Sequence, residues 1–277
     1  MPYHHILSVC LVIAGFGMIP MSAVAQDMRV YTTVSEVTKG LSSPKVLSHS
    51  LTLFHAGKVY DYMEEAGEVV IYEPVHHRFV ILGKNFVAAE VPFTEVNHSL
   101  ESTRTETTRM LDQLRQQADD KSMRVASLIQ FQLEPAFKTS WDESHQRLTM
   151  AADPLQYSVR TAKIESPQFV RQYLDYADWT ARLNFVLRPN AAFPAARLQL
   201  NESLRQEELL PTQVDLQLRQ VQRAEPMRLR AEHQFSWEFQ SVDRRHINHW
   251  ERQLRSNEVR WITFYEYQQQ LVAERTR

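Results

Sequence analysis

Two histidines near the C-terminus have the spacing of helical metal ligands. His246 and His249 lie three positions apart, shortly after Asp243. On a helix this spacing puts both imidazoles on one face, where they could bind a metal together with Asp243 or a ligand from elsewhere in the chain. The pattern differs from HExxH, and no matching carboxylate is identifiable. The simpler interpretation makes Asp243 the N-cap of a short helix, with both histidines beside a face anchored by Trp250. A hydrolase or metal enzyme is therefore a remote alternative.

A second pair, His76 and His77, lies at a predicted turn between two strands. Adjacent imidazoles at a turn could bind a metal or respond to pH near neutrality. A turn that precedes a strand needs no such role, so this pair is a secondary candidate site.

A third histidine, His233, lies within an alternating segment, residues 227–239, whose odd positions are mostly apolar and whose even positions are polar. Alternation places His233 on the same strand face as Phe235 and Trp237. A buried imidazole needs a hydrogen-bond partner, so a satisfied core histidine is the simpler interpretation. The functional interpretation puts His233, Phe235 and Trp237 at a ligand pocket.

Glycine and cysteine are scarce enough to exclude several enzyme classes. No glycine follows Gly83, and the patterns GxGxxG, GxxxxGK and GxSxG are absent. Phosphate-binding loops and nucleophile elbows need glycine where backbone approaches a ligand or takes positive φ. The single cysteine, Cys10, lies in the N-terminal apolar segment. We therefore expect no nucleotide-binding motif, no cysteine chemistry and no cofactor.

The first 25 residues are typical of a signal peptide. Residues 6–25 carry no charge and end in Ala23-Val24-Ala25, the small-x-small pattern before a cleavage site. The flanking N-region offers His4 and His5 where Lys or Arg is usual. An uncleaved anchor of about 20 apolar residues is the alternative. We expect an exported protein, periplasmic or extracellular, with no transmembrane segment after cleavage.

Charge is nearly balanced, with 31 Lys and Arg against 33 Asp and Glu. A nucleic-acid partner is therefore not expected.

The chain from residue 26 to 277 is long enough for one α+β domain, and a boundary near 117–121 would instead divide it into lobes 26–120 and 121–277.

Hydrophobic periodicity predicts strands, a helix, more strands, two helices, two strands, a helix and a final segment. Residues 28–82 predict a meander with one face buried, and 92–117 a helix. Alternation at 125–133 favours a strand, followed by strands at 137–141, 147–151 and 155–162. Helices are expected at 167–187 and 197–209, and a strand at 212–221. Residues 258–267 are assigned as a last strand, and whether the whole segment 258–272 is a strand or a helix stays open.

The strand at 227–239 carries the strongest period and is expected to be central in the sheet. Burial of its apolar side chains would contribute on the order of 10 kcal/mol before entropy is counted. The helix after Asp243 should turn Ile247, Trp250 and Leu254 inward. This order lacks regular βα alternation and predicts an α+β fold with a large curved antiparallel sheet, half-barrel-like, and helices packed on one face.

One segment, residues 51–82, resembles the strand pattern of periplasmic lipoprotein-carrier proteins, the LolA-like half-barrel group. The match includes Gly57-Lys58, Tyr60, Glu68, Ile71-Tyr72-Glu73-Pro74 and Arg78-Phe79. The resemblance implies a curved sheet around a hydrophobic hollow that shelters acyl chains. It covers about an eighth of the chain, and no ligand-contact residue can be transferred from it.

These observations predict an exported, non-enzymatic binding or carrier protein for an apolar, lipid-like or acylated ligand. The alternative is a cell-envelope structural or protein-interaction module with a fully packed core, whose partner is another envelope protein.

Overall fold

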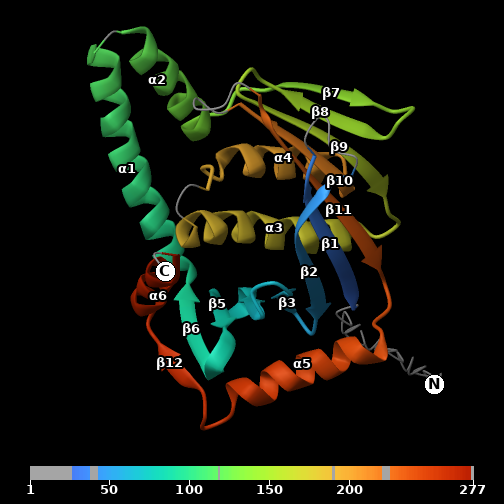
Figure 1. Ribbon diagram of the computed structural model, residues 1–277. Coiled ribbons are helices and arrows are strands. Elements are labelled where there is room, and N and C mark those ends of the chain that lie inside the picture. The colour runs from blue at the N-terminus through green and yellow to red at the C-terminus, as the bar shows by residue number, and fades with distance from the viewer. Residues whose placement is uncertain (1–26, 38–42, 118, 189–190, 220–224, 276–277) are drawn as a thin grey trace, which may run out of the picture.

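The computed structural model describes residues 27–37, 43–117, 119–188, 191–219 and 225–275 (Figure 1). The predicted signal peptide, residues 1–25, lies outside these described residues. Twelve strands form one open sheet, and its order is β12-β6-β5-β4-β3-β2-β1-β11-β10-β9-β8-β7. The predicted fold class, an α+β fold with a large, curved, mostly antiparallel sheet, is confirmed.

The first half of the sheet is an antiparallel meander of six strands. They are β1 (Met28–Glu36), β2 (Lys45–His55), β3 (Lys58–Met63), β4 (Glu68–Glu73), β5 (Arg78–Leu82) and β6 (Val87–Pro92). The two-residue turn Ala56-Gly57 joins β2 and β3 with φ values of 49° and 76°. Two consecutive positive φ angles match the twist of a hairpin, and glycine takes the second at no steric cost.

The second half contains β7 (Lys138–Asp142), β8 (Arg147–Ala151), β9 (Leu155–Lys163), β10 (Leu209–Leu218) and β11 (Met227–Ser236). It joins the first half through β1 and β11, which pair antiparallel with Thr32 opposite His233. A short strand, β12 (Arg260–Ile262), pairs parallel with β6. The segment 117–121, the expected boundary between two lobes, contains the last residue of α1 (Phe93–Gln117) and the first two residues of α2 (Asp120–Leu133).

Six helices accompany the sheet: α1 (Phe93–Gln117), α2 (Asp120–Leu133), α3 (Pro167–Leu187), α4 (Ala195–Gln206), α5 (Ser241–Leu254) and α6 (Phe264–Arg275). Figure 1 shows α3 and α4 lying inside the curve of the sheet, with α1 and α2 forming a hairpin at one side. The central position predicted for β11 is correct, since it lies between β1 and β10.

Both faces of the meander are buried, which corrects the expectation of one buried face. On the inner face, Val59, Tyr72 and Phe79 belong to the main core with α3 and α1 residues. On the outer face, Tyr60, Ile71 and Val80 form a second cluster with Ile247 and Trp250 of α5. Successive strand residues point to opposite faces, so two cores need apolar residues at odd and even positions alike.

The strand predicted at 125–133 is wrong, because this segment belongs to α2. Asp119 is the N-cap, and its carboxylate accepts hydrogen bonds from the backbone N–H groups of Lys121 and Ser122. Ala126 and Leu133 are buried on one side of the helix. Capping at Asp119 and this buried side outweigh the short alternation that favoured a strand.

The strand expected at 258–267 is confirmed only at Arg260–Ile262, and most of the segment 258–272, for which strand or helix was left open, belongs to the helix α6. Thr263 and Glu266 form reciprocal hydrogen bonds that start α6: Glu266 Oε2 accepts from the Thr263 N–H, and Thr263 Oγ1 accepts from the Glu266 N–H. This arrangement is a capping box, which favours a helix over the expected strand.

Burial of β11 is less complete than expected. None of its residues is fully buried, and Trp237, just beyond its end, is exposed. Since these side chains keep part of their solvent contact, the value on the order of 10 kcal/mol is an upper bound for this strand.

Candidate functional site: hollows and buried polar groups of the sheet

An apolar hollow lies at the inner side of the second half of the sheet. Its volume is about 440 Å³, and it is enclosed by α2, residues 191–196 and the ends of β9 and β10. Its larger apolar side chains are Val125, Leu128, Ile129, Phe131, Phe193 and Leu218. The polar side chains among its lining residues are Gln132 and Arg219. Such a surface favours a hydrocarbon ligand over a polar one.

Polar contacts hold the borders of the apolar hollow in place. The side-chain oxygen of Gln132 accepts a hydrogen bond of 3.2 Å from the Phe193 N–H, which ties residues 191–196 to α2. The Arg219 N–H donates to the Pro154 carbonyl at 2.9 Å. The guanidinium of Arg219 lies 3.3 Å from the carboxylate of Asp153, and both side chains are exposed. An exposed ion pair of this kind is weak, so either member can exchange it for another partner.

A larger hollow of about 630 Å³ lies between the C-terminal end of α3 and the side of α6. Its lining includes Met63 and Leu271, but also Glu68, Arg188 and Arg260. The Tyr267 hydroxyl donates a hydrogen bond to Glu68 at its wall. The mixed, charged lining makes this hollow a poorer match to an apolar ligand than the one beside α2.

The predicted pocket residues His233, Phe235 and Trp237 do share one face of β11 and its continuation, but they pack under the first half of α3. The rings of Phe235 and Tyr173 are 5.3 Å apart, and those of Trp237 and Phe169 are 4.8 Å apart. These three residues line neither of the two hollows described above. They form part of the contact between β11 and α3.

His233 is held between the sheet and α3 by one hydrogen bond. Its Nδ1 lies 2.9 Å from the hydroxyl oxygen of Thr32, whereas its shielded Nε2 has no hydrogen-bond partner among the described residues. Burial, together with the positive charge of Arg197, lowers the pKa of His233 to about 3. The imidazole is therefore neutral throughout the physiological pH range.

Asp61 is another polar group on the inner face of the sheet. The Thr52 hydroxyl donates to its carboxylate at 2.8 Å. Desolvation raises the pKa of Asp61, and hydrogen bonds from Tyr176, Thr52 and Ser50 offset that rise only in part. The sequence around Asp61, Lys58-Val-Tyr-Asp-Tyr62, gives no indication of the hydroxyl groups that surround its carboxylate.

The proposed metal ligands Asp243, His246 and His249 make other contacts in the structure. Asp243 is fully buried at the third position of α5, and its Oδ2 accepts a hydrogen bond of 2.7 Å from the Gln240 N–H. Gln240, rather than Asp243, is thus the N-cap, and the two form a capping box. Asp243 Oδ2 also lies 3.4 Å from Arg29 Nε. Within the described ranges, no group of three or more His, Cys, Asp or Glu residues is arranged to hold a metal.

His246 and His249 instead border a hollow of about 380 Å³ on the outer face, next to Tyr62 and Trp250. The His246 ring stacks against that of Trp250 with centroids 5.5 Å apart and an interplanar angle of 17°. This stacking matches the simpler sequence interpretation, in which both histidines border a face anchored by Trp250.

The pair His76 and His77 lies in the turn between β4 and β5. His76 Nδ1 is 3.5 Å from Glu73, and the His76 side chain is exposed. His77 has φ +51° and ends the short 3₁₀ turn Pro74–His76. His76 thus contacts Glu73 beside the turn, and His77 ends the turn.

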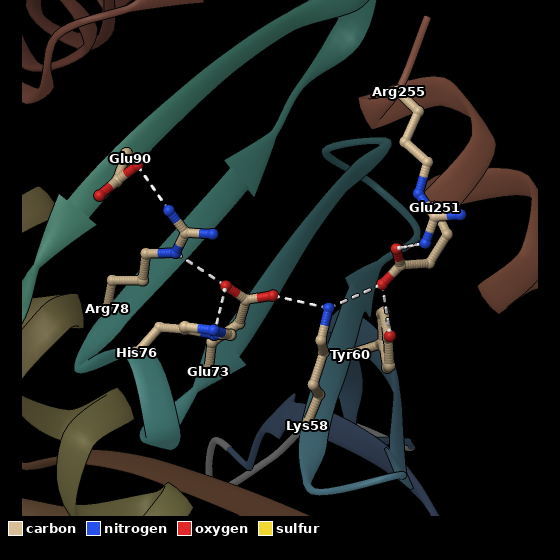
Figure 2. Close-up of polar contacts among 8 residues, drawn as sticks. All are labelled: Lys58, Tyr60, Glu73, His76, Arg78, Glu90, Glu251 and Arg255. Atoms are coloured by element: carbon tan, nitrogen blue, oxygen red, sulfur yellow. Dashed lines mark hydrogen bonds and ion pairs between the residues drawn. The ribbon is translucent and has the colours of Figure 1, made fainter.

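A network of charged groups joins α5 to the outer face of the meander, as Figure 2 shows. Lys58 lies 2.7 Å from Glu73 and 3.0 Å from Glu251 of α5. Arg78 continues the row through Glu73, at 2.7 Å. Tyr60 donates to Glu251 at 2.7 Å. Because all of these contacts link side chains within the sheet or between the sheet and α5, we assign the network a structural role.

No protein-family model and no curated protein matches this chain. In the part of the chain that the structure describes, no helix has the length and apolar character needed to cross a membrane.

Proposed function

We propose that this protein is an exported, non-enzymatic carrier that holds an apolar, lipid-like chain in the hollow beside α2. The observation that carries the proposal is the lining of that hollow, whose side chains are apolar apart from Gln132 and Arg219. Its volume of about 440 Å³ falls within the usual range for small-molecule sites. The resemblance of residues 51–82 to lipoprotein carriers supports the same ligand class.

The free energy of binding would come mainly from removing hydrocarbon from water, at about 25 cal/mol per Å² of apolar surface. The hollow offers few groups to orient a polar ligand, so selectivity for chain length and branching is expected to exceed selectivity for headgroup. Arg219 is the charged residue that lines the hollow and lies 3.3 Å from the exposed Asp153, so the polar end of an amphiphile could remain beside this pair in solvent.

A protein-interaction module is the second candidate, and the packing of α3 supports it. Tyr173, Leu174 and Tyr176 are buried between α3 and the sheet, so the centre of the concave face is filled. If this filling extends to the hollow in solution, the protein would act through its surface. The proposed enzyme at Asp243 gains no support, because that carboxylate is used by Gln240 and Arg29.

The deciding experiment is native mass spectrometry of residues 26–277 purified from an envelope fraction, followed by titration with a fluorescent long-chain fatty acid. Leu128→Trp and Leu218→Trp fill the hollow from its helical and sheet walls. Val46→Trp is the matched control, because Val46 is 48% exposed and lies outside the hollow. We expect both wall variants to lose the ligand and the control to retain it.

Two results would contradict the carrier proposal. One is a parent protein that contains no lipid and takes up none of the fluorescent fatty acid. The other is undiminished uptake by both wall variants, each shown by circular dichroism to be folded. Either result would favour the interaction module.

A further inference from the structure

The edge strand β7 is open to solvent along its whole length. Among the strands of the described residues it comes last in the sheet order and pairs only with β8, and all five of its residues are exposed. Figure 1 shows it at the outer edge of the second half, away from α5 and α6. An uncovered edge presents unpaired backbone N–H and C=O groups, which are a template for another strand.

The sequence of β7, Lys138-Thr-Ser-Trp-Asp142, is complementary to itself in the antiparallel direction. Pairing two copies about Ser140 places Lys138 opposite Asp142 of the second copy, and this occurs twice by symmetry. Opposite charges directly across an antiparallel pair stabilise it, whereas like charges destabilise it. In this register every residue faces a residue of the same parity, for example 138 faces 142. Residues whose backbone N–H and C=O groups point outward therefore face each other, as an antiparallel ladder requires.

The charged groups remain able to make these contacts. Lys138 has no ion pair with any residue in the described ranges. Asp142 accepts hydrogen bonds within its own turn, from the Ser144 hydroxyl and from the N–H and imidazole of His145. A carboxylate has about four acceptor positions, so a lysine of a second copy can be added to these donors. The turn also lowers the pKa of Asp142 to about 2, which keeps it ionised.

Trp141 supports the same register independently. Its side chain is 40% exposed, an uncommon position for the largest apolar side chain. In the self-pair, Trp141 lies opposite Thr139 of the second copy and diagonal to the second Trp141. Diagonal neighbours across a ladder are within reach of aromatic side chains, so the two indoles would cover each other.

We propose that two copies of this protein associate through β7, in a two-fold symmetric antiparallel pair that makes one continuous sheet. The partner is taken to be a second copy of this chain, because an identical strand in this register satisfies both Lys138–Asp142 pairs at once. A two-fold contact of this kind closes on itself and does not propagate into fibres. Five residues per copy form a small interface, so the association is expected to be weak and dependent on concentration.

The test uses sedimentation equilibrium of residues 26–277 over a concentration series, with charge-reversal variants. Lys138→Glu alone and Asp142→Lys alone each place like charges opposite one another, and we expect dimerisation to weaken by at least about tenfold. An equal mixture of the two variants restores both opposite-charge pairs and should dimerise again. Lys121→Glu, an exposed charge change on α2, is the control and should behave as the parent.

Tryptophan fluorescence provides a second readout. Trp141→Phe should remove the change in emission that accompanies dimerisation of the parent. The proposal is overturned if the parent remains monomeric at about 1 mM, the weak limit for a specific contact. It is also overturned if the parent dimerises but the single variants do so equally well, or if their mixture fails to recover.

Discussion

Nδ1 of His233 lies 2.9 Å from the hydroxyl oxygen of Thr32, its direct partner across the β1–β11 ladder. This contact joins the two halves of the sheet on its inner face. The other ring nitrogen is shielded and has no partner within the described residues, so a proton placed there would be a buried, uncompensated charge.

His233 should make the protein less stable below neutral pH. Its pKa is lowered to about 3 in the folded protein, whereas an unfolded histidine titrates near 6.5. Between these values only the unfolded chain binds the proton, so the free energy of unfolding decreases as the pH falls through this window. The loss is about 2 kcal/mol at pH 5.

The measurement is urea unfolding of the parent and of His233→Gln at pH 7.5 and pH 5. The variant should lose less stability than the parent between the two values. His98→Gln, which removes an exposed histidine on α1, is the control. An equal pH dependence for parent and His233→Gln would contradict the assignment.

Asp61 should have the opposite pH dependence. Burial raises its pKa in the folded protein, so its contribution to stability is greatest below the unfolded pKa and is lost as the pH rises through the folded one. Asp61→Asn removes the buried charge but keeps an acceptor for Thr52. We expect a higher melting temperature than the parent at pH 8 and a difference that shrinks at pH 4. A lower melting temperature at pH 8 would show that the ionised carboxylate stabilises the fold.

Asp243 should be required for the stability of α5. Asp243→Ala removes the acceptor of the Gln240 N–H and leaves the buried Arg29 Nε without its nearest carboxylate. We expect a loss of about 1–3 kcal/mol in the free energy of unfolding. Asp112→Ala, at an exposed position on α1, should cost much less. Adding zinc or a chelator should leave the parent's melting temperature unchanged, and a metal-dependent shift absent from Asp243→Ala would revive the metal hypothesis.

Glu73 should anchor the outer-face network at neutral pH. Burial disfavours its charge, but hydrogen bonds from Lys58 and Arg78 outweigh that effect and lower the pKa of Glu73. Its contribution is thus present above the unfolded pKa and is lost as the pH falls through the lower, folded value. We expect Glu73→Gln to cost about 1–3 kcal/mol at pH 7 and less near pH 3.

Glu90→Gln tests the same network at its exposed end. Glu90 also lies 2.7 Å from Arg78, but its side chain is 48% exposed. Its removal should cost less than about 1 kcal/mol, as for other surface ion pairs. Equal costs for Glu73→Gln and Glu90→Gln would mean that burial does not strengthen the contacts of Glu73.

Much of the fold follows from local sequence patterns. The strands over residues 28–82, the helices expected at 92–117 and 167–187, and the interior position of β11 follow from long hydrophobic periods, whereas β6 (Val87–Pro92) was not expected. The errors at α2 and α6 share a cause. In both segments the strand interpretation gave no weight to the capping residues that start the helix, Asp119 in one case and Thr263 with Glu266 in the other. The pattern Thr263-x-x-Glu266 was available in the sequence as the capping-box signature.

The hollow beside α2 could not be predicted in the same way. Its walls come from α2, residues 191–196 and two strand ends, which are distant in sequence. Asp61 likewise has hydroxyl neighbours on β2 and α3 that only the register brings together. The spacing of His246 and His249, in contrast, suggested a metal site that included Asp243, whereas Asp243 forms the capping box of α5.

The position of β1 between β2 and β11 also determines the order in which strands can pair while the chain is being synthesised. The partner of β1 on one side follows at once, but its partner on the other side is about two hundred residues later. Until residues 227–236 have been synthesised, β1 remains an open strand edge in the middle of the future sheet. Closing so long a loop has a high entropic cost, so folding of the whole sheet should be slow and should depend on the last quarter of the chain. In this period the exposed edge is a natural target for chaperones and a risk for misassembly.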